Sequence, residues 1–207
     1  VVRDKIAITQ SFEYRFIRTP VYTLPPLARD MELESLDSFT QVDFKIGLRQ
    51  SATVSLSIYP QKMNYVGLNT FTPQQATSDF RQRGYLLTLQ HRYTPDARSL
   101  LVSQMSIKRY DADVRAHSDE VYRIGVETKE GGFFNRQDRE SSRIEWQETY
   151  HFIPRLPGGS HSSKLGINIV HNSYDGHYVM MPVEILRASG SVAERFDFGP
   201  AAFVRIR

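Results

Sequence analysis

The 207-residue sequence contains no cysteine, and this absence excludes several kinds of protein at once. Without thiols the chain forms no disulfide scaffold and no thiolate metal site, and it has no cysteine nucleophile. Long apolar runs are missing too, since no stretch approaches the roughly 18 to 20 residues that a membrane-spanning helix requires. A transmembrane β-strand needs only about 9 to 11 residues of alternating character. The lack of long apolar runs therefore excludes membrane-spanning helices but is compatible with membrane-spanning strands.

Motifs typical of enzymes are also absent. The sequence has no P-loop, no Gly-x-Gly-x-x-Gly after a strand, no Gly-x-Ser-x-Gly elbow and no His-Glu-x-x-His. The histidines 151, 161, 171 and 177, with Asp175, could in principle bind a metal. In the topology predicted below, however, they lie at opposite ends of the strands, about 30 Å apart across a bilayer. We therefore expect no enzyme activity, no catalytic residue, no metal site and no cofactor.

A strong excess of one charge is missing as well. The 26 basic and 23 acidic residues give a net charge of +3 and are spread along the whole chain. A nucleic-acid-binding protein would gather its basic residues on one face, so we expect no nucleic-acid partner. The first residues, Val1 to Asp4, contain no charged region followed by an apolar one. We expect either that a signal peptide was removed or that the chain is an internal fragment.

What the sequence does contain is a period of two in hydrophobicity, which is typical of strands with one apolar face. The alternation begins between Ile6 and Phe16 and is clearest from Gln41 to Ile58. It predicts strands at 39–48 and 52–60, joined by a tight turn at 49–51, with a single long strand as the alternative. The even positions should form one lipid-facing surface of Val42, Phe44, Ile46, Leu48, Val54, Leu56 and Ile58.

Weaker alternation later in the chain completes an all-β prediction. Residues 135–147 are rich in Gln, Glu and Arg, as a helix would be, but the apolar residues from Ile144 onward are spaced by two, which favours a strand. Turns are expected at 95–98, 157–160 and 174–176, where Pro, Asp and Gly gather. The remaining strands are predicted near 85–92, 101–107, 144–152, 165–169 and 179–187.

The predicted connections alternate between long and short. Up-and-down barrels of the outer membrane combine short periplasmic turns with longer external loops, whereas the loops of a soluble sandwich typically run about 2 to 6 residues. The prediction is therefore an antiparallel up-and-down meander, a partial transmembrane β-barrel of about eight strands. The long connections are 18–38, 61–83 and 111–135, and the short ones are 49–51, 95–98 and 154–162.

Aromatic and basic residues fit the same topology. Aromatic rings near strand ends are typical of the interfacial girdles of a barrel, although they would also suit the rim of a soluble core. These are Tyr14, Phe16, Tyr59, Tyr85, Tyr93, Tyr110, Tyr150, Phe152 and Tyr174. Basic side chains would line the lumen or its outer mouth, or else form cross-strand ion pairs. These are Arg81, Arg83, Arg92, Arg136, Arg139 and Arg143.

Five segments of the sequence resemble the barrels of TonB-dependent receptors, in the branch with a carboxypeptidase-regulatory-like N-terminal domain. They are 133–137 (FFNRQ), 145–150 (EWQETY), 164–166 (KLG), 172–176 (NSYDG) and 182–185 (PVEI). The sequence departs from the family in having no TonB box, no plug domain and no terminal aromatic residue. Family barrels have 22 strands, so the resemblance implies that residues 1–207 are a middle piece of the barrel domain.

The resemblance also implies a function and partners. The parent protein would take up a large or scarce solute through the outer membrane, driven by the inner-membrane TonB complex. This chain would contribute barrel wall in contact with outer-membrane lipid, and the parent chain would supply the plug domain and the remaining strands. Two alternatives stay open: a soluble secreted β-sandwich or carbohydrate-binding module, and a complete eight-stranded barrel.

Overall fold

The computed structural model describes residues 5–154, 161–199 and 202–206, and its regular structure is almost entirely β. Nine strands form the main sheet: β1 (Ile6–Pro20), β2 (Asp30–Lys45), β3 (Gln50–Ile58), β4 (Gln61–Val66), β5 (Ser78–Asp96), β6 (Ser99–Ala116), β9 (Asn135–Phe152), β10 (Ser163–Met180) and β13 (Ala202–Ile206). A small second sheet contains β7 (Tyr122–Ile124), β8 (Lys129–Glu130), β11 (Val183–Leu186) and β12 (Val192–Phe196). One 3-10 helix, η1 (Gln74–Ala76), precedes β5.

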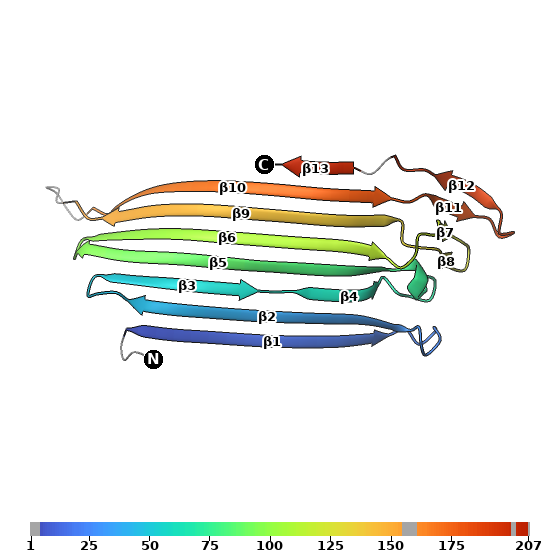
Figure 1. Ribbon diagram of the computed structural model, residues 1–207, viewed down its shortest axis with the longest axis horizontal. Helices are drawn as coiled ribbons and strands as arrows, with labels where there is room; N and C mark the ends of the chain where they lie inside the picture. The colour runs from blue at the N-terminus through green and yellow to red at the C-terminus, as the bar shows by residue number, and fades with distance from the viewer. Residues whose placement is uncertain (1–4, 155–160, 200–201, 207) are drawn as a thin grey trace.

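The main sheet is a single-layered antiparallel meander in which each long strand pairs with the next (Figure 1). β3 and β4 both lie between β2 and β5, so the nine strands occupy eight positions across the sheet. Among the residues described, β1 pairs with β2 alone and β13 with β10 alone, so the sheet is open. The predicted all-β, up-and-down fold is confirmed, and a closed eight-stranded cylinder is excluded for this part of the chain.

The first tight turn lies earlier than predicted. Phe44 pairs with Ala52 and Lys45 with Ser51, so residues 46–49 form the turn instead of 49–51. The N–H groups of Ile46 and Gly47 both donate to the Gln50 carbonyl, at 3.1 and 3.2 Å. The register differs from the predicted one by an even number of residues, so each strand side chain stays on the face of the sheet that was predicted for it. Gly47 lies within this turn, where glycine is a common turn residue.

The three long connections are shorter than expected because the strands run further, and 67–77 and 117–134 replace the predicted 61–83 and 111–135. β1 and β2 stay paired up to Pro20 and Asp30, so their connection is 21–29 instead of 18–38. β10 passes through the predicted turn at 174–176 and ends at Met180. In these outer portions both faces of the sheet carry polar side chains, so the hydrophobic period disappears although the backbone pairing continues. The turn predicted at 157–160 lies outside the described residues.

The predicted strand at 179–187 is wrong in its placement. Its core, β11, belongs to the second sheet, where it pairs antiparallel with β12 and parallel with β7. β7 and β8 come from the connection between β6 and β9, and β11 and β12 come from the connection that follows β10. Two long connections therefore fold together at the end of the main sheet opposite the tight turns (Figure 1).

The main sheet has almost no core of its own. In the described ranges the buried apolar residues are Leu68, Ala76, Ala112, Tyr122 and Val183, mostly in or near the long connections. A sandwich would bury the even positions of 42–58 under a second sheet. The second sheet instead lies beyond the strand ends (Figure 1), and Ile58 on this face is 40% exposed. The sandwich alternative is therefore not the fold.

Candidate functional site

A continuous apolar surface crosses one face of the main sheet. Residues paired directly across antiparallel strands point to the same face, so the register assigns every side chain to one side. We call this side the apolar face and its apolar stretch the apolar band. The central row of the band runs through Ile8, Val42, Val54, Leu89, Met105, Trp146 and Ile169.

The apolar band is as tall as a membrane would require. On β5 it extends from Tyr93 to Tyr85, which is about 26 Å along a strand and comparable with the apolar band of outer-membrane barrels, about 25 Å tall. Its side chains are exposed in the chain alone: Ile169 by 55%, Leu89 by 46% and Trp146 by 44%. An apolar patch that crosses seven strands far exceeds what soluble monomers expose, so another molecule must cover it.

The polar side chains within the apolar band bind one another. Thr40 Oγ1 donates to Gln10 Oε1 at 2.5 Å across β1 and β2, and Ser103 Oγ donates to Glu148 Oε1 at 2.7 Å across β6 and β9. A polar group in an apolar environment costs much less free energy when a hydrogen bond satisfies it. These pairs allow polar residues to occupy the band without breaking its character.

The opposite side, which we call the polar face, has the reverse chemistry at the same height. Its central row consists of Ala7, Asp43, Thr53, Gln90, Gln104, Gln147 and Asn168. Asp43 accepts hydrogen bonds from Thr53 at 2.6 Å and Gln41 at 2.9 Å, and Gln90 donates to Gln104 at 3.3 Å. Side chains of this face form a hydrogen-bonded layer suited to water or to a polar partner.

The strands continue well beyond the apolar band. β9 and β10 pair over their full length of 18 residues, about 60 Å, whereas a bilayer requires only about 9 to 11 residues. Above Tyr85 the apolar face becomes charged, with Arg109 pairing with Asp111 at 3.2 Å and with Glu140 at 2.8 Å. We call this part the charged region. It lies toward the end that carries the long connections.

Two glycines on the polar face are covered by tyrosine rings. A Cβ at Gly84 would collide with the ring of Tyr59, and one at Gly176 would collide with Tyr174 and Tyr178. The hydroxyls of Tyr174 and Tyr178 hydrogen-bond to each other above Gly176. Glycine weakens a strand, and an aromatic ring packed over it restores contact. This packing explains why Gly176 lies within a strand instead of the predicted turn.

The register divides the predicted lipid-facing residues into two groups. Val42, Phe44, Val54, Leu56 and Ile58 lie on the apolar face of β2 and β3. Ile46 and Leu48 lie in the turn, where their exposed fractions are 61% and 108%, so their assignment to a strand is wrong. The structure adds residues of the band that the sequence analysis did not assign to this surface, above all Leu89, Met105 and Trp146.

The predicted basic group is also divided, between the two faces. Arg92, Arg139 and Arg143 lie on the polar face, and Arg143 pairs with Glu145 at 2.9 Å. Arg81, Arg83 and Arg136 lie on the apolar face within the charged region. Arg136 binds Asp119 at 2.5 Å and the Ser118 carbonyl at 2.6 Å. The six residues therefore do not form one site.

The aromatic residues predicted for the girdles are distributed unequally. Tyr59, Tyr110 and Tyr174 lie on the polar face, where Tyr110 donates to Gln82 Oε1 at 3.0 Å. The other six lie on the apolar face near the two limits of the band: Tyr14, Phe16, Tyr85, Tyr93, Tyr150 and Phe152. Six of the nine therefore occupy positions that a girdle requires.

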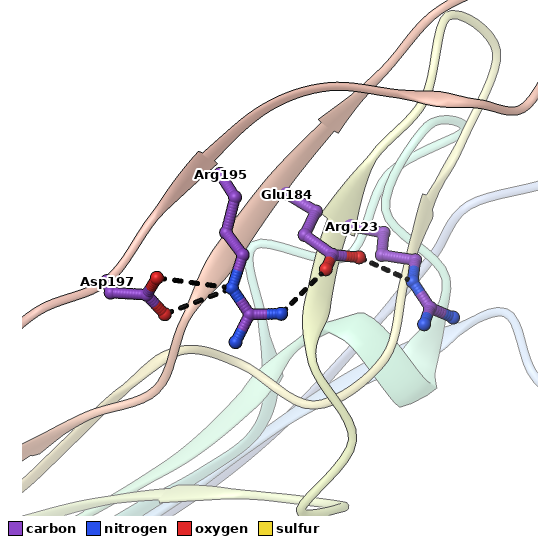
Figure 2. Close-up of polar contacts among 4 residues, drawn as sticks. All are labelled: Arg123, Glu184, Arg195 and Asp197. Carbon is purple, nitrogen blue, oxygen red and sulfur yellow. Dashed lines mark hydrogen bonds and ion pairs between the residues drawn. The ribbon is translucent and has the colours of Figure 1, made fainter.

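The second sheet contains an ion-pair network that the sequence analysis missed (Figure 2). The Glu184 carboxylate accepts from Arg123 Nε at 3.1 Å and from Arg195 Nη1 at 3.0 Å, while Arg195 Nε donates to Asp197 at 3.0 Å. The Glu184 side chain is only 10% exposed, and the two arginines are 47% and 46% exposed. Hydrogen bonding to Asp197, followed by its charge and that of Glu184, raises the pKa of Arg195.

Apolar and aromatic residues pack the second sheet against the segments that adjoin the main sheet. Tyr122 packs against Phe133 and Phe134, with ring centroids 6.2 and 5.6 Å apart, and burial raises the pKa of its hydroxyl. Val183 on β11 is buried in the same cluster. At Gly131, φ is +78°, a conformation that favours glycine, and a Cβ would collide with the Val121 carbonyl. The two long connections therefore form an ordered cap.

The predicted histidine positions do not suggest a metal site. His151 pairs with Lys164 near the tight turns, whereas His177 pairs with Asp138 near the opposite strand ends. Across the described ranges, the histidine, aspartate and glutamate side chains nowhere form a group of three that could hold a metal ion. In the same ranges, every helix is too short to span a membrane.

Comparisons with known proteins support the fold. No protein-family model matches the sequence, and no curated protein does either. The solved structure of the outer membrane transporter YddB from Escherichia coli is similar, with a TM-score of 0.69 and 11% sequence identity. The alignment covers 99% of this chain and 28% of that chain. At this identity the likeness establishes the fold alone, which is that of part of an outer membrane transporter.

Proposed function

We propose that this chain forms part of the barrel wall of a TonB-dependent outer-membrane receptor that takes up a solute by an energy-dependent process. The parent chain would contribute the plug domain and the remaining strands, and the TonB complex of the inner membrane would drive transport. In this role the chain has no catalytic residue and needs no cofactor or metal ion.

The observation that carries the proposal is the pair of opposite faces at one height of a single-layered sheet. Leu89 and Trp146 belong to an exposed apolar row, while Gln90 and Gln147, their neighbours in sequence, belong to a hydrogen-bonding row. Transmembrane barrels require this arrangement, because lipid covers one face and the water-filled or plugged lumen meets the other. The open sheet, with eight positions, would be completed by the other strands of the parent.

The arrangement of the other elements supports this proposal. Tight turns at one end suit the periplasmic side, and the longer connections at the other end suit the outer surface. The lumen would receive Arg92, Arg139 and Arg143, whereas Val42, Phe44, Val54, Leu56 and Ile58 would face lipid. The ordered cap made from β7, β8, β11 and β12 would then stand over the outer mouth, where loops commonly determine specificity.

Genetic tests of the intact parent separate the parts of this proposal. Cells that lack the parent gene, cells that lack TonB and wild-type cells are grown on limiting amounts of single scarce nutrients. A growth defect on the same nutrient in both deletion strains, with the parent recovered in the outer-membrane fraction, is the expected result. A defect that persists only in the parent deletion would contradict TonB dependence. Recovery of the parent as a water-soluble protein would contradict the membrane location.

A further inference from the structure

A groove of about 450 Å³ lies on the apolar face, immediately above the apolar band. It opens beside Pro60, which separates β3 from β4. Leu36 N–H donates to the Pro60 carbonyl at 3.0 Å, but proline has no N–H with which to return the bond. Side chains from β1, β2, β4, β5 and β6 surround the groove, so it belongs to the sheet and not to a loop.

Three cations that line the groove form no ion pair with any of the described residues. Lys62, on β4, pairs directly with Arg81 on β5, and Arg83 lies two residues from Arg81 on the same face. Within the described chain, none of the three forms an ion pair or a side-chain hydrogen bond, and both arginines are exposed. Cβ atoms of directly paired residues lie about 5 Å apart, and those two apart on a strand about 7 Å. The three can therefore contact one anionic group.

The acidic residues of the groove are already engaged. Glu34 accepts a hydrogen bond from the Tyr14 hydroxyl at 3.0 Å, and Asp113 binds Arg115 at 2.5 Å. Elsewhere in the charged region the cations are paired, as Arg109 is with Asp111 and Glu140. Glu34, Asp113 and Asp111 lie directly opposite Lys62, Arg81 and Arg83 in the sheet, but in the described chain they form no ion pair with them. Four basic and two acidic residues line the groove, so its lining retains an excess of positive charge.

A second hollow of about 380 Å³ shares Pro60 and Arg83 with the groove. Leu56, Ile58 and Tyr85, at the upper limit of the band, line it together with the paired Arg109 and Asp111. A ligand that extends from the groove into this hollow would have an anionic head beside the cations and apolar chains against the band. Inorganic phosphate would use the groove alone, so the shared lining of the two favours a lipid.

We infer that Lys62, Arg81 and Arg83 bind the phosphate of a phosphorylated glycolipid in the outer leaflet of the outer membrane. This inference rests on the proposed function, which places the band in lipid and the long connections outside the cell. Arginine and lysine form charge-assisted hydrogen bonds with phosphate, and partial removal from water strengthens these bonds. The acyl chains of the lipid would lie over Ile58 and Leu56, where they cover apolar surface that the chain leaves exposed.

Lipid retained by the intact parent tests this assignment. The parent is purified from outer membranes in a mild detergent, and bound lipopolysaccharide is measured by native mass spectrometry and phosphate analysis. The variant with Lys62→Gln, Arg81→Gln and Arg83→Gln should retain no more than about one tenth of the wild-type amount of lipopolysaccharide, since the loss of even one charge-assisted hydrogen bond is worth that factor. The matched control, with Arg92→Gln, Arg139→Gln and Arg143→Gln on the polar face, should retain the wild-type amount.

Rebinding to delipidated parent identifies the ligand. Lipopolysaccharide should restore the bound state, while inorganic phosphate and vesicles of glycerophospholipid should not compete with it at equal phosphate concentration. Equal retention by both triple variants, or equal competition by either alternative, would overturn the inference. Wild-type recovery of the parent in the outer-membrane fraction is the internal check, because its loss would refute the proposed function instead of this site.

Discussion

The apolar band and the charged region above it lie on the same face of the same strands, yet different interactions stabilise them. In the band, Leu89 pairs with Met105, and neither side chain is buried by the protein. In the charged region, Arg109 bridges Asp111 and Glu140. The first arrangement is favourable where hydrocarbon or another apolar surface covers it, and the second is favourable where water solvates the ions. The change occurs between Tyr85 and Arg83, and under the proposed function the membrane boundary lies there.

The largest expected effect is a charge at the centre of the band. Leu89→Arg should destabilise the folded parent by about 2 to 4 kcal/mol, the cost of an arginine at the midplane of a barrel's lipid face. Gln90→Arg, one residue away on the polar face, should cost far less because its side chain reaches the lumen. Equilibrium unfolding of the full parent in lipid vesicles measures both. Equal costs for the two variants would remove the distinction between the faces.

A smaller effect is expected at the boundary between the regions. Gly84→Ala should destabilise the parent by about 1 to 3 kcal/mol, because the added methyl group must displace the Tyr59 ring. Gly47→Ala is the matched control, since a Cβ at Gly47 has open space around it. The same unfolding assay applies. Equal unfolding free energies for the two variants would show that the Tyr59 ring moves aside freely.

The cap should respond more weakly to loss of its central carboxylate. Glu184→Gln should loosen the second sheet by about 1 to 2 kcal/mol, less than a fully buried pair, because both arginine partners are half exposed. Glu194→Gln on β12, an exposed residue, is the control. Hydrogen exchange of the amides in β7 and β11 reports the change. Unaltered exchange in the Glu184 variant would mean that packing around Tyr122 alone maintains the cap.

The sequence predicts the strands of the apolar band but not their continuation into the charged region. Within the band the two faces differ in chemistry, so the period of two predicted the strands around Val42, Val54 and Leu89. In the charged region both faces are polar, and the continuation of β1 to Pro20 and of β10 to Met180 left no such signal. The second sheet depends on a parallel pairing of β7 with β11, a contact between distant segments that local patterns do not encode.

The candidate surface was predicted in part for similar reasons. Parity placed Val42, Phe44 and Leu56 on the correct face, and an even error in the turn could not change that. The split of the arginines could not be predicted, because no alternation surrounds Arg81, Arg83 or Arg136. In the sequence, Glu184 is notable only as an acidic residue between Val183 and Ile185. Its importance depends on the burial of β11, which the sequence alone does not show.

The smallest effect concerns the turn. Ile46→Arg should change the unfolding free energy by less than about 0.5 kcal/mol, as is usual for exposed positions, because this side chain lies beyond the band. The contrast with Leu89→Arg would sharpen the lower limit of the membrane region. A cost as large as that of Leu89→Arg would indicate that the turn lies within the lipid.

The most direct test of the central claim is the accessibility of the two faces in living cells. Residues 1–207 contain no cysteine, so single cysteines introduced there into the proposed parent, freed of any others, report single positions. Positions 44, 54, 56 and 89 on the apolar face should react with a lipid-soluble reagent alone. Positions 43, 53, 55 and 90 on the polar face should react with a small water-soluble reagent or be protected only by the plug. Protection of the first four from both reagents would mean that protein, not lipid, covers the apolar band, and would contradict the account.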